Sequence, residues 1–203
     1  MTDNAEELDL RDRLNLIETM IAEGRRKTES WGWTFVLWGV AYYIAIAWAA
    51  LGNPALAWPV TMVAASILTG VLASRNRSKG PETTIGRSMM AIWIGVGISL
   101  FLLMMFLSIT GRMEIHIGVA IVCAMLGMAN VTSSIILRWK VQFGCAIGWW
   151  ACLIAALFVS EAQAGILFLI ALFFCQIVFG IYGMIRESRR NRAIVARQGA
   201  SHA

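Results

Sequence analysis

Charged side chains are scarce in this sequence, and where they are missing they are missing in blocks. Only 14% of the 203 residues are charged, against about a quarter in an ordinary soluble domain. Hydrophobic residues make up 59% of the chain and gather in runs of about 20 residues, the length that crosses a bilayer as a helix. The composition therefore excludes an ordinary soluble domain and predicts an all-α, polytopic membrane protein.

Histidine and paired cysteine are also scarce, which counts against enzymes and metal proteins. The chain has two histidines, His116 and His202, and it contains no HExxH motif, P-loop or pair of carboxylates within an apolar run. Its four cysteines all lie inside apolar runs and form no CxxC pair. We therefore expect no enzymatic activity, no catalytic residue, no metal site and no cofactor.

Proline and intramembrane charge, two marks of ion-coupled carriers, are nearly absent from the apolar runs. Of the three prolines, only Pro59 lies inside a run. Neutral polar side chains remain, among them Asn130 and Gln176. Hydrogen bonds between helices are the simpler interpretation of these groups. A path for a small neutral or lipidic solute, in a transporter or channel, is the alternative.

The apolar runs predict six membrane-spanning helices. Three of the connections between them are short, at 52–54, 110–114 and 160–163, so consecutive spans are expected to form three antiparallel helical hairpins. The chain then consists of a cytosolic amphipathic helix at 1–29, a transmembrane bundle at 30–186 and a basic cytosolic tail at 187–203. The six spans are placed at 31–51, 55–73, 89–109, 115–137, 141–159 and 164–185.

Positive charge is distributed very unevenly over this arrangement. Sixteen of the seventeen Lys and Arg residues fall on one side of the six-span chain, and only Arg112 lies on the other. Positively charged segments stay on the cytoplasmic side, so both termini are predicted to be cytoplasmic, with the chain in the inner (plasma) membrane of the cell. Topology and lipid headgroups explain the basic tail, and no nucleic-acid partner is expected.

The segment from Ile115 to Arg138 is expected to lie at the centre of the bundle. One face of it carries only small or polar residues, which let helix backbones approach closely and hydrogen-bond to neighbours: Cys123, Gly127, Asn130 and Ser134. Gln176 on the sixth span is a candidate partner for the Asn130 amide. On the fifth span, Gly144 and Gly148 begin a row of small residues at every fourth position, which predicts another close-packing face.

The N-terminal segment predicts a helix from Ala5 to Glu23 that ends near Gly24. Four apolar residues, here called the apolar row, recur on one face of this helix at spacings of four, three and four: Leu10, Leu14, Ile17 and Ile21. The segment 1–29 holds eight acidic and five basic side chains, which suits anionic lipid poorly. We expect the apolar row to dock on a second copy or on a different protein; rest on the membrane surface is the alternative.

These features together favour a non-enzymatic membrane protein. The chain lacks reactive groups, has several close-packing faces and carries a cytosolic helix whose apolar side needs a partner. We expect a signalling or regulatory component, or a subunit of a larger membrane assembly, that docks its partner through the N-terminal helix.

Overall fold

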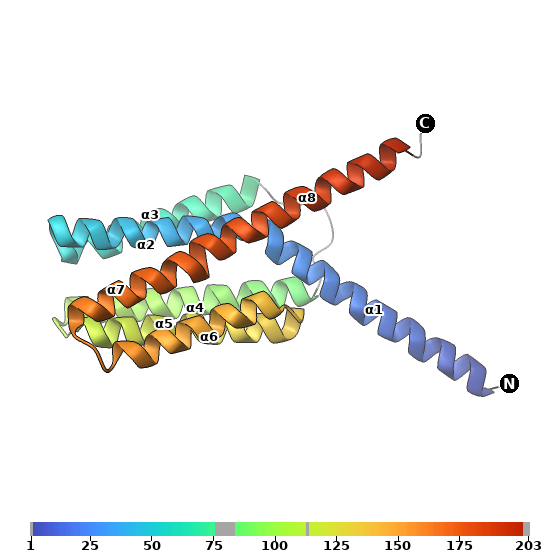
Figure 1. Ribbon diagram of the computed structural model, residues 1–203, viewed down its shortest axis with the longest axis horizontal. Helices are drawn as coiled ribbons and strands as arrows, with labels where there is room; N and C mark the ends of the chain where they lie inside the picture. Colours follow the sequence, from blue (N-terminus) through green and yellow to red (C-terminus); the bar gives the residue numbers. More distant parts are fainter. Residues whose placement is uncertain (1, 76–83, 113, 201–203) are drawn as a thin grey trace.

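A computed structural model describes residues 2–75, 84–112 and 114–200, and every regular element within these ranges is a helix. Figure 1 shows a bundle of roughly aligned helices with two long arms at one end. The elements are α1 (Thr2–Ser30), α2 (Gly32–Leu51), α3 (Pro54–Arg75), α4 (Thr84–Ile109), α5 (Ile115–Leu137), α6 (Lys140–Ala156), α7 (Glu161–Leu172), the π-helical turn η1 (Phe173–Val178) and α8 (Phe179–Ala200).

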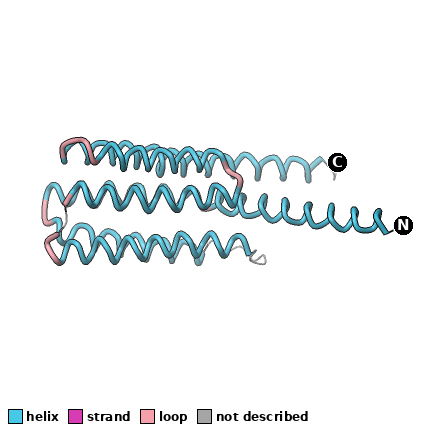
Figure 2. The backbone as a smooth tube through the Cα atoms, turned by 90° about the horizontal axis from the view of Figure 1, so that it is seen from below, coloured by secondary structure: helices cyan, strands magenta, loops and turns pink. Residues whose placement is uncertain are grey.

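The bundle has two groups of helices with a third element running between them. In Figure 1, α2 and α3 lie on one side, and α4, α5 and α6 on the other. The continuous rod of α7, η1 and α8 crosses obliquely, in contact with α2 on one side and with α5 and α6 on the other. Figure 2 shows from a second direction that the helices of the bundle run roughly parallel. Both termini leave the bundle at the same end.

Within the part of the chain that the structure describes, five helices are long and apolar enough to cross a membrane: α2, α3, α4, α5 and the α7–α8 rod. This is consistent with a multi-pass membrane protein. The fifth predicted span, placed at 141–159, is shorter than expected, because α6 ends at Ala156 and has 17 residues. The segment 160–163, predicted as a loop, also differs, since α7 begins at Glu161. The Gln163 side chain accepts a hydrogen bond from the Ser160 backbone N–H at 3.1 Å, which caps the helix start.

The helix α1 does not end near Gly24, contrary to the sequence prediction, but continues to Ser30. A Cβ atom built on Gly24 would lie 2.7 Å from Cγ2 of Ile85 and 3.0 Å from Cδ2 of Leu137. Glycine at this position thus allows α1 to approach the ends of α4 and α5 closely. The residue serves packing rather than helix termination, and a break follows only at Trp31, before α2.

The central helix is α5, as its small and polar face predicts. Half of the residues in the apolar stretch of α5 are buried, whereas only 11% are buried in the corresponding stretches of α3 and of α4. Its most extensive contacts are with α6, and the two are joined by a tight turn in which Arg138 adopts φ 48°. The α5–α6 pair therefore forms the inner wall against which the α7–α8 rod packs.

Candidate functional site

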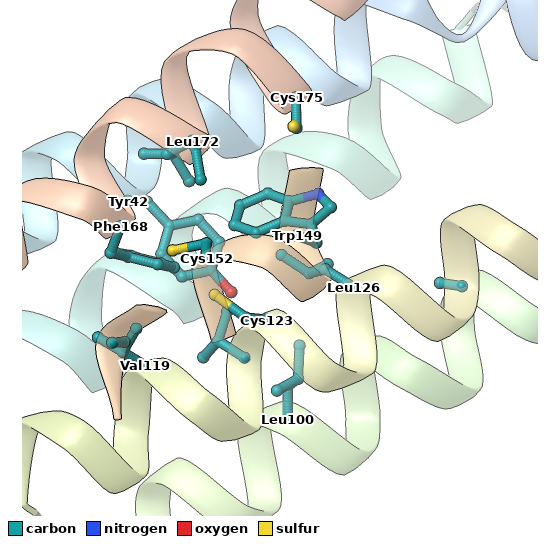
Figure 3. Packing of buried hydrophobic residues seen from close by; sticks show 14 of the residues in the cluster. Tyr42, Leu100, Val119, Cys123, Leu126, Trp149, Cys152, Phe168, Leu172 and Cys175 are labelled. Atoms are coloured by element: carbon teal, nitrogen blue, oxygen red, sulfur yellow. The ribbon is translucent and has the colours of Figure 1, made fainter. Parts of the chain in front are cut away.

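The small and polar face of α5 lies inside the bundle. Its four residues are all buried: Cys123, Gly127, Asn130 and Ser134. Figure 3 shows the sulfur atoms of Cys123 and Cys152 facing each other between α5 and α6. A Cβ atom built on Gly127 would overlap the indole of Trp150. This face is therefore the seam of the α5–α6 pair.

The hydrogen bond expected between Asn130 and Gln176 is not among those that the structure records. Nδ2 of Asn130 instead donates to the carbonyl oxygen of Leu126 in the same helix, at 2.8 Å. Its Oδ1 has no hydrogen-bond partner among the described residues, and neither does Oε1 of Gln176. A carbonyl one turn back on the same helix is always within reach of a short side chain, whereas a partner on another helix depends on helix positions that sequence does not specify.

Gln142 is a third buried amide, which the sequence analysis missed. It is fully buried on α6, and within the described ranges neither its Oε1 nor its Nε2 has a hydrogen-bond partner. Unpaired polar groups are costly in an apolar interior. Gln142 is the second residue of the span predicted at 141–159, and its burial was not evident from the sequence. By contrast, Ser133 is paired, since the indole N–H of Trp93 donates to its Oγ at 3.2 Å.

The π-helical turn η1 carries Gln176 and faces two other helices. A Cβ atom built on Gly148 of α6 would lie 3.0 Å from Sγ of Cys175, and one built on Gly39 of α2 would lie 3.3 Å from Cβ of Gln176. Short π-helical segments occur mostly as insertions within α-helices and frequently at functional sites. Here the turn places the buried Cys175 thiol and the Oε1 atom of Gln176, which has no partner among the described residues, at the junction of α2, α6 and the α7–α8 rod.

Gly144, predicted on a close-packing face, does not pack against another helix of the same chain among the described residues. It is exposed, and a Cβ atom built on it meets no heavy atom within 4 Å among the described residues. A row of residues at every fourth position rotates by about 40° around the helix at each step. The row therefore reaches the interface at Gly148, whose added Cβ atom would lie 3.0 Å from Sγ of Cys175, and continues in it at Cys152 and Ala156, which are buried, while its first member lies outside.

The apolar row of α1 is covered at its base and exposed farther out. Leu10, Leu14 and Ile17 are 59%, 55% and 51% exposed, whereas Ile21 is half-buried. Gly24, three residues further along the same face, lies against α4 and α5. The row thus starts on the bundle and continues onto the arm that projects from it in Figure 1. Leu16, also exposed at 61%, lies on a different face of the helix.

Two surface hollows accompany these features. One, of about 750 Å³, lies between the start of α2 and α8 and is lined by Ser30, Trp33, Met184, Glu187, Ser188, Asn191 and Arg192. The other, of about 300 Å³, lies between α4 and α5. Neither is lined by Asn130, Gln142 or Gln176, so the buried amides are not in contact with either hollow.

Metal ligands do not gather in the described part of the chain, where no three His, Cys, Asp or Glu side chains lie together. The four cysteines are free thiols. No protein-family model, curated protein or solved structure matches the chain.

Proposed function

We propose that this is a non-enzymatic integral membrane protein that docks a partner through α1, as a signalling or regulatory component or as a subunit of a larger membrane assembly. The observation that carries the proposal is the exposure of Leu10, Leu14 and Ile17 on one face of an arm outside the bundle. Three large apolar side chains exposed in a row on one helix mark a site of association. The net acidic composition of the segment 1–29 makes lipid a poor host.

The proposal places the chain in the inner membrane with six spans, arranged as three hairpins, and both termini in the cytoplasm. The distribution of Lys and Arg supports this orientation. An even number of crossings is also in accord with the exit of both termini at one end of the bundle. On this proposal α6 is the additional crossing besides the five long helices.

Topology is tested by reporter fusions placed on either side of α6. We expect a fusion after Lys140 to report a cytoplasmic location, and fusions after Gly111 and after Gln163 to report an external one. Lys140 and Gln163 flank α6, so the pair isolates the crossing of this helix. The same location for both fusions would show that α6 does not cross and that the chain has five spans.

Docking through α1 is tested by placing a charge on the apolar row. We expect Leu14→Asp and Ile17→Asp each to reduce association of α1 with its protein partner at least about tenfold, because a carboxylate would be desolvated in the interface. The measurement is photo-crosslinking in membranes from a probe at Leu10. Leu16→Asp is the matched control, since Leu16 is equally exposed on another face, and it should leave the protein adducts unchanged.

Insertion serves as the second control in this experiment, since α1 lies outside the apolar spans and every variant should enter the membrane normally. Labelling of lipid alone, unchanged by Leu14→Asp or Ile17→Asp, would contradict docking and favour a helix that rests on the membrane surface.

A transporter or channel for a small neutral or lipidic solute is the second candidate. It is favoured by one observation: among the described residues, the side-chain amide oxygen atoms of Asn130, Gln142 and Gln176 have no hydrogen-bond partner inside the bundle. Such groups need hydrogen-bond partners, and a polar solute or water passing through the bundle could supply them. The candidates are separated by Asn130→Leu: uptake of a neutral solute into liposomes that is lost without a loss of stability would favour transport.

A further inference from the structure

The apolar row of α1 has the spacing of a coiled-coil seam. Apolar residues that alternate at intervals of three and four occupy the a and d positions of a heptad repeat. With Leu14 and Ile21 at a, Leu10 and Ile17 fall at d, and Gly24 takes the next d position. At the d position of Gly24, the bundle of the same chain occupies the space in which a partner helix would pack. The positions farther out on the arm are available to another helix.

The charges beside the row fit a parallel pair of identical helices. Arg13 occupies a g position and Glu18 the e position of the following heptad, and both are exposed. In a parallel coiled coil these two positions face each other across the seam and select partner and orientation. On a single helix, by contrast, surface neighbours are three or four residues apart, and Arg13 and Glu18 are five apart. Arg13 and Glu18 are therefore not neighbours of each other on one helix, but they lie opposite each other in a parallel pair.

The membrane supplies the orientation that this pairing requires. Two copies inserted the same way present their α1 arms on the same side and pointing in the same direction. The contact of Gly24 with Ile85 and Leu137 holds the base of each arm on its own bundle. A helix with so short a seam is marginal in solution, but confinement to one membrane raises the effective concentration of the second copy.

We propose that α1 pairs with α1 of a second copy of this chain as a parallel coiled coil, with the apolar row as its seam and Arg13 facing Glu18 of the partner subunit. This inference rests on the proposed docking function and names its partner. The charge match favours a second copy as the partner, because both members of the pair, Arg13 and Glu18, are supplied by this chain.

The first experiment is oxidative crosslinking of the full chain in membranes. A cysteine at Leu14, on the seam, should give a covalent dimer, and a cysteine at Leu10 should do the same. Leu16→Cys is the matched control and should give at least about fivefold less dimer, because position 16 points away from the seam. The unmodified chain, whose four cysteines lie in the bundle, sets the background.

The second experiment exchanges the charges in the Leu14→Cys chain. Arg13→Glu or Glu18→Arg alone puts like charges opposite each other twice in each dimer, and we expect about fivefold less crosslinking. The double exchange should restore it. When the two single variants are co-expressed with different tags, the mixed dimer should form in preference to either homodimer, because only the mixed pair is attractive at both contacts.

Each other outcome has a defined meaning. A dimer from Leu14→Cys that the charge exchange neither weakens nor restores overturns the parallel register. Protein adducts that depend on the apolar row, without any crosslink between copies, overturn self-pairing but retain docking on a different protein. Lipid adducts alone, independent of the row, overturn the proposed docking function as well.

Discussion

Replacing Gly180 with alanine is expected to lower the free energy of unfolding by about 3 kcal/mol, at the upper end of the usual cost of overpacking. A Cβ atom on Gly180 would lie 2.6 Å from the carbonyl oxygen of Gly32 and 3.0 Å from the backbone nitrogen of Val36. Both contacts are with backbone atoms of α2, which cannot rotate away as a side chain can. The methyl group must therefore separate α2 from α8.

The two glycines at this crossing act together. A Cβ atom on Gly32 would likewise lie 2.6 Å from the carbonyl oxygen of Gly180. Gly32→Ala should therefore destabilise the bundle by a similar amount. The double variant should cost less than the sum of the two, because one separation of the helices relieves both clashes.

Reversible unfolding in detergent micelles or bicelles measures this effect. Gly165→Ala is the matched control on the same rod, since a Cβ atom there meets nothing within 4 Å in the described part of the chain. The control should be neutral or slightly stabilising, because alanine favours helix over glycine. Equal stability of the Gly180 and Gly165 variants would contradict a close crossing of α2 and α8.

Replacing Trp149 with alanine is expected to destabilise the bundle by about 3–5 kcal/mol, the usual cost of removing a large buried aromatic residue. Trp149 is completely buried, with 0% of its surface accessible. Its ring lies 6.0 Å from that of Phe168, and Figure 3 shows it surrounded by Leu126, Leu172 and Cys175. Alanine would leave a cavity where α5, α6 and the α7–α8 rod meet.

The adjacent tryptophan provides the control. Trp150 is 36% exposed and lies over Gly127 at the outside of the α5–α6 seam. Lipid chains can fill the space that Trp150→Ala leaves, so this substitution should cost about 1 kcal/mol. Thermal unfolding of the two variants side by side is the measurement. A larger loss from Trp150→Ala than from Trp149→Ala would mean that the buried face of α6 is assigned wrongly.

The positions of the long apolar helices could be predicted from the sequence, because the thickness of the bilayer sets the length of an apolar run that crosses it. The fourth span was predicted at 115–137, and α5 runs from Ile115 to Leu137. The exclusion of Gly144 from the packing face was not predictable by residue type. A small residue is compatible with close packing but does not require it. A row with one residue at every fourth position winds slowly around the helix, so only part of the row faces a given neighbouring helix.

Polar partners were the least predictable feature of the bundle. The burial of Asn130 and Gln176 follows from their place inside apolar runs, but the choice of Leu126 as the partner of Asn130 follows from local geometry. The role of Gly24 was missed for a related reason. Glycine after a helical pattern often ends the helix, and only the position of Ile85 and Leu137 shows that close contact is the reason here.

The short helix α6 has a consequence for the lipid around the protein. Its 17 residues extend about 25 Å, whereas the hydrocarbon core of a typical bilayer is about 30 Å thick. On the proposed six-span topology α6 crosses the membrane, and its outward side chains include Phe143, Ile147 and Ile154. Either the bilayer beside these side chains thins locally, or the side chain of Lys140 extends from the end of the helix toward the headgroups. The protein would then be matched to thin regions of membrane, and the deformation would attract other short-spanned proteins to the α6 side.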